Sequence, residues 1–287
     1  MNNALIVGVD GTVASRTALR WALVRATLDG KSVHLVHVVD DEWGCVGSSA
    51  LRELHAIGAG VLRREVSYAH GTMPEVDVTS ELLVGHPITV LGDLSASSGA
   101  AIVGTHKSGF FHGRVFGSRS IQLAAVVRCP LFVIPSDSQR QRRHVVVGVD
   151  NAAMSGAAIA FAAREAARLD QDLVLLKAGP GRGEMDDTRA LDAAVEVARR
   201  STPDTTMQVR RTAGRAGERL AAASESAMLT VVGRPQRRMP VPLGGTSTDL
   251  LLNMGGPVAV VPCPALQSGD DVHYERPVDV ADRAVVL

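Results

Sequence analysis

The chain carries one sequence pattern twice, and this repeat limits what it can fold into. An apolar run ending in Gly-Val-Asp stands at Ala4–Asp10 (ALIVGVD) and again at His144–Asp150 (HVVVGVD). A short polar stretch and an Ala-rich segment with helical spacing follow each run. Each copy then has a glycine-containing loop, starting at Gly104 or Gly233, and closes on an apolar run ending in proline, PLFVIP or PVAVVP. Because the landmarks keep their order, the sequence indicates a duplicated domain.

The repeat divides the 287 residues into two domains of ordinary size. We expect the first domain at residues 1–137 and the second at residues 144–265, joined by a polar linker (SDSQRQRR) over residues 136–143. Residues 266–287 show no periodicity, and we expect them to form an irregular C-terminal tail.

Hydrophobic residues make up 46% of the chain but aromatic residues only 3%, so the cores must be built from Val, Leu, Ile and Ala. This composition is typical of parallel sheets that helices cover on both faces. Apolar runs alternate with helical stripes along both copies, which indicates βαβ units. The sequence therefore predicts an α/β protein of two tandem Rossmann-like domains, each with a five-stranded, mostly parallel sheet and helices on both faces.

The patterns also predict where the elements lie. Residues 40–58 are expected to form a loop, with a helix from Ala50 left open as an alternative. The GHP turn at residues 85–87 should lead into a helix. Strands are predicted at 5–9, 33–39, 77–83, 100–103, 131–134, 145–149, 173–176, 207–212, 229–232 and 258–261, and helices at 17–28, 153–169, 187–200 and 217–226.

Charge and cysteine content exclude several classes of protein. The 30 basic residues balance 30 acidic ones, so we expect no nucleic-acid partner. No apolar run approaches the roughly 20 residues that span a bilayer, and we expect no membrane partner. No signal peptide is recognisable, and three cysteines make no disulfide framework. We therefore expect a cytoplasmic protein.

Parallel sheets bind ligands at the carboxyl ends of their strands, where the strand order reverses. This rule places Gly8–Asp10 with Gly104–Ser118 at one such edge, and Gly148–Asp150 with Gly233–Thr248 at another. Glycines allow close backbone approach, and the free N–H groups at a helix start attract anions, so each loop is a candidate phosphate site. The alternative is that such loops need glycines and a helix cap whether or not a ligand binds.

These loops, together with the repeat, resemble the universal stress protein family in its tandem two-domain form. That family's ATP-binding loop reads G-x2-G-x9-G-[S/T]. In the first copy Gly104 and Gly117-Ser118 fit the outer positions, while Lys107 stands in place of the second glycine. In the second copy Gly233 fits, Gln236 replaces the second glycine, and Gly245-Thr246 arrives one residue early. The Lys107 ammonium could pair with a phosphate.

The resemblance implies an adenine nucleotide α-hydrolase-like fold and a cofactor, which is ATP or another adenine nucleotide, with Mg²⁺ left open. The end of the first strand would line the adenosine, Val38 would read the adenine edge, and the loop would hold the phosphates. The implied binding residues are Gly8, Asp10, Val38, Gly104, Thr105, Lys107, Ser108, Gly109, Arg114, Gly117, Ser118 and Arg119 in the first copy and Gly148, Asp150, Gly233, Gly245, Thr246 and Ser247 in the second.

No residue set predicts catalysis. The chain has no G-x-x-x-x-G-K-[ST], no G-x-G-x-x-G after a strand and no G-x-S-x-G. Asp10 and Asp150 are expected to orient a ribose or cap the following turn. His34 and His37, three apart on a strand, should point to opposite faces, so we expect no metal site. Any ATPase activity should be slow.

Three functions remain open. The first is a stress-response protein in which bound nucleotide biases a conformation or an unknown protein partner. The second is a degenerate member that binds no ATP and serves as an interaction module, which Lys107, Gln236 and the shortened loop favour. The third is a nucleotidyl- or phosphoryl-transfer enzyme on the same fold.

The resemblance further implies that the last strands of the two domains pair antiparallel, which makes the chain an intramolecular pseudo-dimer. A homodimer of the whole chain stays open. Such pairing would bring Cys129 and Cys263 towards each other, and a regulatory disulfide between them is a hypothesis.

Overall fold

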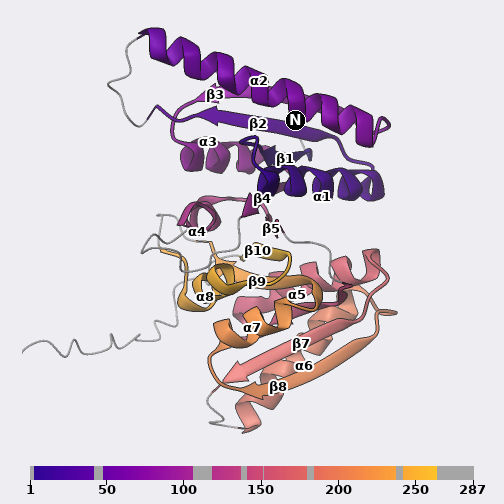
Figure 1. The fold of residues 1–287 in the computed structure, drawn as a ribbon. Coiled ribbons are helices and arrows are strands. Elements are labelled where there is room, and N and C mark those ends of the chain that lie inside the picture. The colour runs from indigo at the N-terminus through magenta and orange to yellow at the C-terminus, as the bar shows by residue number, and fades with distance from the viewer. Residues whose placement is uncertain are drawn as a thin grey trace, which may run out of the picture.

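The computed structural model describes residues 3–41, 48–105, 118–136, 141–150, 152–179, 184–236 and 242–263. Over these ranges the chain forms a single ten-stranded sheet (Figure 1). The first half contains β1 (Leu5–Gly8), α1 (Val13–Asp29), β2 (Val33–Val39), α2 (Ser48–Thr72), β3 (Val78–Val84), α3 (Pro87–Leu94), a 3₁₀ turn (Ser95–Ser97), β4 (Ala100–Thr105), α4 (Ser118–Val126) and β5 (Leu131–Pro135). The second contains β6 (Arg143–Gly148), α5 (Ala152–Arg168), β7 (Leu173–Gly179), α6 (Glu184–Ser201), β8 (Met207–Ala213), α7 (Ala216–Ser224), β9 (Ala227–Pro235), α8 (Gly245–Asn253) and β10 (Val258–Cys263).

The strand order is β3-β2-β1-β4-β5-β10-β9-β6-β7-β8. Pairs within each half are parallel, and the two halves join where β5 runs antiparallel to β10, with Phe132 opposite Ala259. The predicted fold class and the predicted pairing of the last strands are both confirmed. In each half the chain moves outward from its first strand and then returns to the other side of it. The strand order therefore reverses between β1 and β4, and again between β6 and β9.

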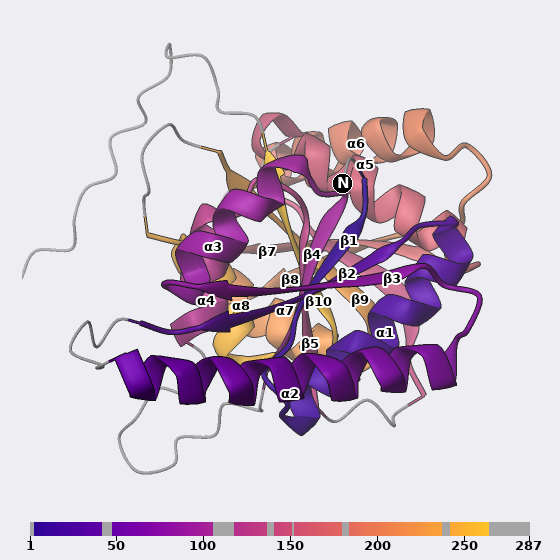
Figure 2. The same cartoon turned by 90° about the horizontal axis from the view of Figure 1, so that it is seen from above.

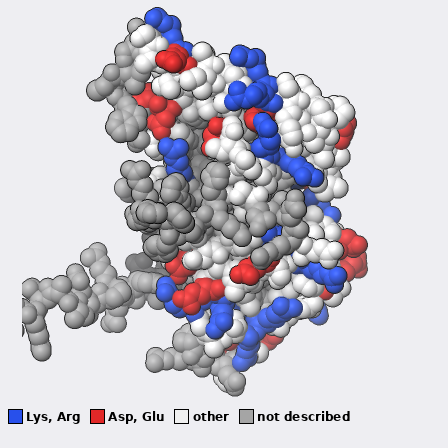
Figure 3. Space-filling view, viewed as in Figure 1, with Lys and Arg blue, Asp and Glu red and all other residues white. Residues whose placement is uncertain are grey.

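Two hydrophobic clusters cover the two faces of the sheet, because successive strand side chains point to opposite sides. Leu5 and Val7 lie in the cluster that α1, α2, α5 and α6 cover, whereas Ile6 lies in the cluster under α3, α4, α7 and α8. Apart from Phe132 the fully buried large side chains are Leu and Ile, as the composition predicted. On the outer surface, acidic and basic side chains occur over both halves (Figure 3).

Helix α2 confirms the alternative of a helix from about Ala50 and corrects the loop predicted over residues 48–58. It spans 25 residues from Ser48 to Thr72 and lies along the first half as one long helix (Figure 2). Residues 51–57 are all exposed, including Leu51, Leu54 and Ile57. The first turns of α2 thus carry apolar side chains at helical spacing but do not bury them against the sheet. Residues 42–47 and the C-terminal tail from 264 lie outside the described residues.

Candidate functional site

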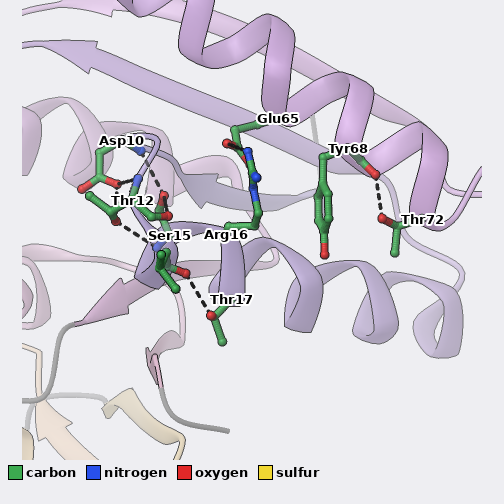
Figure 4. Close-up of polar contacts among 9 residues, drawn as sticks. Asp10, Thr12, Ser15, Arg16, Thr17, Glu65, Tyr68 and Thr72 are labelled. Carbon is green, nitrogen blue, oxygen red and sulfur yellow. Dashed lines mark hydrogen bonds and ion pairs between the residues drawn. The ribbon is translucent and has the colours of Figure 1, made fainter.

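The carboxyl end of β1 runs into a closed turn that starts α1 (Figure 4). The Asp10 carboxylate accepts hydrogen bonds from the backbone N–H of Thr12 (2.9 Å) and from its hydroxyl (2.6 Å). Gly11 has a φ of +79°, a conformation that L side chains rarely adopt. Thr12 is the N-cap of α1 and accepts from the N–H of Ser15. Asp10 therefore caps the turn, one of the two roles expected for it.

An ion pair holds the first turn of α1 against α2. Arg16 donates to both carboxylate oxygens of Glu65, from Nη2 at 2.6 Å and from Nε at 3.1 Å. Glu65 is completely buried, and its hydrogen bonds raise the pKa of the Arg16 guanidinium against the opposing effect of burial. The Arg16 guanidinium also lies 5.1 Å from the centre of the Tyr68 ring. These contacts position the turn that Asp10 closes.

Gly104 has a packing role that the sequence did not reveal. A Cβ added there would overlap the carbonyl group of Ala14 and lie 2.7 Å from the N of Ser15. The first turn of α1 therefore rests directly on the end of β4. The glycine was expected to admit a ligand, but in this structure it admits the backbone of a helix.

The described site residues of the first half meet at one edge of the sheet. Gly8 pairs with Val103 of β4, and Gly104 and Thr105 follow at the same carboxyl end. On β2, Val38 packs partly buried against the α3–α4 face. Arg119, in the first turn of α4, lies 3.5 Å from the Asp40 carboxylate, just beyond the end of β2. The edge thus joins β1, β2, β4 and the start of α4.

The remaining first-half predictions lie beyond what the structure describes. Ser118 begins α4, but its side chain is outside the described part of the chain. The same holds for the whole of Lys107, Ser108, Gly109, Arg114 and Gly117. The roles implied for these residues stay predictions.

The edge of the second half has the same Asp–Ser contact after its first strand, with Lys177 as an additional positively charged residue beside it. The Asp150 N–H donates to Ser155 Oγ (3.1 Å), as the Asp10 N–H does to Ser15 Oγ (3.3 Å). Lys177 donates to the Asp150 carbonyl oxygen and lies 3.6 Å from its carboxylate. In the first half the matching position is His37. Sequence reasoning missed Lys177, although a lysine within the apolar run LVLLKAG was a visible signal.

The structure also corrects the alignment of the second loop. Buried positions of α4 and α8 match at a spacing of 127, since Ser120 corresponds to Ser247 and Leu123 to Leu250. Gly245 therefore corresponds to Ser118, and Thr246 to Arg119. Because Gly104 and Gly233 differ by 129, the second loop is two residues shorter, not one.

The second edge differs accordingly. Gly245 begins α8, whose N-cap Gly244 makes no side-chain capping bond. Glycine thus stands where the first half has Ser118, and Ser247 is buried. At the end of β6, a Cβ on Gly148 would lie 2.9 Å from Leu220. Gly233 lies in β9 opposite Val261.

His34 and His37 face opposite sides of the sheet, as predicted. His34 lies 2.8 Å from Thr79 Oγ1 and 3.2 Å from the Glu81 carboxylate on β3. His37 lies under α2, with Nδ1 2.7 Å from the carbonyl oxygen of Val9. Each imidazole is held by strand neighbours, and the described residues contain no group of three ligands that could hold a metal ion.

A separate cleft of about 850 Å³ runs along the outer face of α1. Its lining includes Thr12 and Arg16 at one end and Leu28 and Arg168 at the other, but not Gly8, Val38 or Gly104. The cleft is therefore distinct from the edge formed by β1, β2 and β4, where residues 106–117, one wall of the predicted site, are outside the described chain.

Cys129 and Cys263 are both buried free thiols. They belong to clusters on opposite faces of the sheet, so the antiparallel pairing of β5 and β10 does not bring them together. The expected approach of the two cysteines is wrong, because Cys129, before β5, packs on the α3–α4 face and Cys263, in β10, packs on the opposite face. Burial raises the pKa of Cys129 to about 11 and also raises the pKa of Cys263.

These thiols should be unreactive in the folded protein. In a Cys45→Ser variant at pH 7.5, we expect iodoacetamide to modify Cys129 roughly 300-fold more slowly than an ordinary thiol, because only the thiolate reacts. Peptide mass spectrometry over time measures the rate, and the same sample in guanidinium chloride is the control. Native labelling as fast as the unfolded control would contradict the burial that we describe.

The comparisons with known proteins agree with this architecture. Residues 1–135 match the model of the universal stress protein family. The chain is 28% identical to universal stress protein Rv1996 of Mycobacterium tuberculosis over 304 residues, which cover 92% of this chain and 96% of that protein. It is 31% identical to universal stress protein Rv2623 of the same organism over 188 residues, 61% of this chain and 63% of that protein.

The fold has a counterpart among solved structures. The crystal structure of a universal stress protein from Archaeoglobus fulgidus matches with a TM-score of 0.72 over 91% of this chain and 96% of that one, at 15% identity. None of the helices described is long and apolar enough to cross a membrane. The match to the family model, the relative that shares the two-domain length and the shared fold agree. Residues 1–135 belong to the universal stress protein family, and the whole chain is similar to members of that family that share its tandem two-domain length.

Proposed function

We propose that this protein binds ATP or another adenine nucleotide at the carboxyl edge of its first half, and that the bound state biases a conformation or a protein partner in a stress response. One observation carries the proposal. The turn after β1, the end of β2, the end of β4 and the start of α4 meet where the strand order reverses. This is where open α/β sheets take their ligands.

The first-half residues have separable roles in this proposal. The Asp10 turn supports the adenosine, and Val38 lies beside the adenine. The phosphates face the N-terminus of α4, where the helix dipole and free N–H groups favour anions. Arg119 and Lys107 supply positive charge to the phosphates, and any Mg²⁺ would bind together with the nucleotide through its phosphates.

We propose weaker binding in the second half. Its loop is two residues shorter, and Gly245 stands where the first half has Ser118. Lys177 donates to the Asp150 carbonyl oxygen, whereas at the matching position of the first half His37 Nδ1 contacts the carbonyl oxygen of Val9. Because the sequence offers no catalytic motif, we propose a binding protein with slow hydrolysis at most.

Paired variants in the two halves test this assignment. Calorimetric titration with ATP should show dissociation constants at least tenfold higher for Asp10→Glu and Gly117→Ala, because each change reshapes the first edge. The matched changes Asp150→Glu and Gly244→Ala should leave that affinity within about twofold of the parent value. Equal losses from both sets would contradict a first-half site, and unchanged binding in all four would place the nucleotide elsewhere.

A second candidate is an interaction module that binds no nucleotide. Two observations favour it: Lys107 replaces the second loop glycine, and Gly104 is already explained by its contact with Ala14. Purified protein that releases no nucleotide on denaturation, and whose melting temperature does not move in millimolar ATP, would support this candidate instead.

A further inference from the structure

The two halves are related by a pseudo-twofold axis at the β5–β10 pair. Equivalent residues of the first strands and helices differ by 140, as with Leu5 and Val145, which occupy matching positions in their sheets. The buried faces of α1 and α5 match at the same spacing, with Ser15 over Ser155 and Ala22 over Ala162. At one matched pair the two residues carry opposite charges, because position 25 is Arg and position 165 is Glu.

These two opposite charges bind each other across the axis. Arg25 Nη1 and Nη2 each lie 2.7 Å from one carboxylate oxygen of Glu165. Asp29 lies 3.3 Å from Arg25, and Arg168 lies 2.6 Å from Glu165 and 3.6 Å from Asp29. The four charges therefore form a closed ring of alternating sign, which we call the axial ring. Two members come from α1 and two from α5.

The axial ring is shielded from solvent. The side chains of Arg25 and Glu165 are 9% and 5% exposed. Burial alone would raise the pKa of Glu165, but hydrogen bonds and charges from Arg25 and Arg168 lower it overall. Like charges in this place would meet with little screening, and a buried charge left without a partner is strongly destabilising.

Side-chain size is also matched across the axis. Phe132 and Ala259 are equivalent residues that face each other in the β5–β10 register. The Phe132 ring lies between Trp21 (4.7 Å between ring centres) and Phe161 (5.9 Å). Two copies of the first half would put two phenylalanines here, and two copies of the second would put two alanines. The first is overpacked and the second leaves a void.

We infer that the axial ring and the Phe132–Ala259 contact make the last-strand edge of each half selective for the other half and exclude a second copy of itself. A pair of first halves would bring two Arg25 side chains together, and a pair of second halves two Glu165 side chains. Each pair of halves joined at β5–β10 therefore contains one full-length β4–α4 loop and one shorter β9–α8 loop. The same selectivity prevents this edge from forming a homodimer.

Charge reversal in the intact chain tests the inference. The first-half reversal is Arg25→Glu with Asp29→Arg, and the second-half reversal is Glu165→Arg with Arg168→Glu. Each keeps the net charge and the ion pair within its own helix, but makes both contacts between the halves repulsive. We expect either reversal to lower the melting temperature by about 10 °C. Small-angle scattering should show a larger radius of gyration.

The variant that combines both reversals is the strongest test of the inference. All four changes restore the alternating ring, so its melting temperature should return to within about 3 °C of the parent value. As a second measurement, refolding the two reversals together should give a reciprocal dimer of twice the 30.1 kDa chain mass, since each first half then fits the second half of the other chain. Recovery in either arm supports the selectivity. Recovery in neither, or reversals that melt like the parent, would overturn it.

Discussion

Replacing Gly104 with alanine is expected to lower the free energy of unfolding by about 3 kcal/mol. The new Cβ would overlap the carbonyl group of Ala14 and lie 2.7 Å from the N of Ser15. These are backbone atoms of the first turn of α1, which the Arg16–Glu65 pair holds against α2, so they cannot move aside easily. Urea unfolding followed by circular dichroism measures the loss.

The matched control for this change is Gly60→Ala. Gly60 lies inside α2, where an added Cβ meets nothing closer than 3.7 Å. Because alanine favours a helix over glycine, this variant should be more stable by about 0.5–1 kcal/mol. If Gly104→Ala unfolds at the parent urea concentration, β4 and α1 are not in the close contact that we describe.

Truncating Phe132 to alanine should lower the free energy of unfolding by about 3–5 kcal/mol, the range for removing a buried aromatic ring. The Phe132 side chain is completely buried on the axis between the halves. Its loss leaves Trp21 and Phe161 without their shared partner, and removes the ring over which the Arg25 guanidinium lies at 4.5 Å. Guanidinium chloride unfolding with tryptophan fluorescence reports the change.

Two control variants show whether the loss in Phe132→Ala comes from the packing of the ring. Phe132→Leu keeps most of the volume and should lose only about 1 kcal/mol. Phe132→Ala with Ala259→Phe moves the ring to the facing strand of the same cluster, so it should regain part of the lost stability. A loss in Phe132→Ala no larger than that in Phe132→Leu would show that the axis is not tightly packed.

Local patterns predicted the parts of the fold that depend on backbone periodicity. The strand Val33–Val39 was predicted with its observed bounds, because a buried parallel strand is one continuous apolar run. The start of α2 was left open between a loop and a helix from Ala50, because its first turns are exposed and pack against no strand. The carboxyl edges were likewise predictable, because apolar strands ending at Gly8 and Gly104 mark where a parallel sheet takes a ligand.

The sequence by itself determined the duplication, the parallel α/β fold and the carboxyl edge that we propose as the nucleotide site, because these follow from repeated landmarks and short-range periodicity. Tertiary structure alone decided the rest. It assigned Gly104 to the backbone of α1, put Cys129 and Cys263 on opposite faces, and moved the second loop by one residue. It also paired Arg25 with Glu165, 140 residues apart, because such a contact depends on how two surfaces meet.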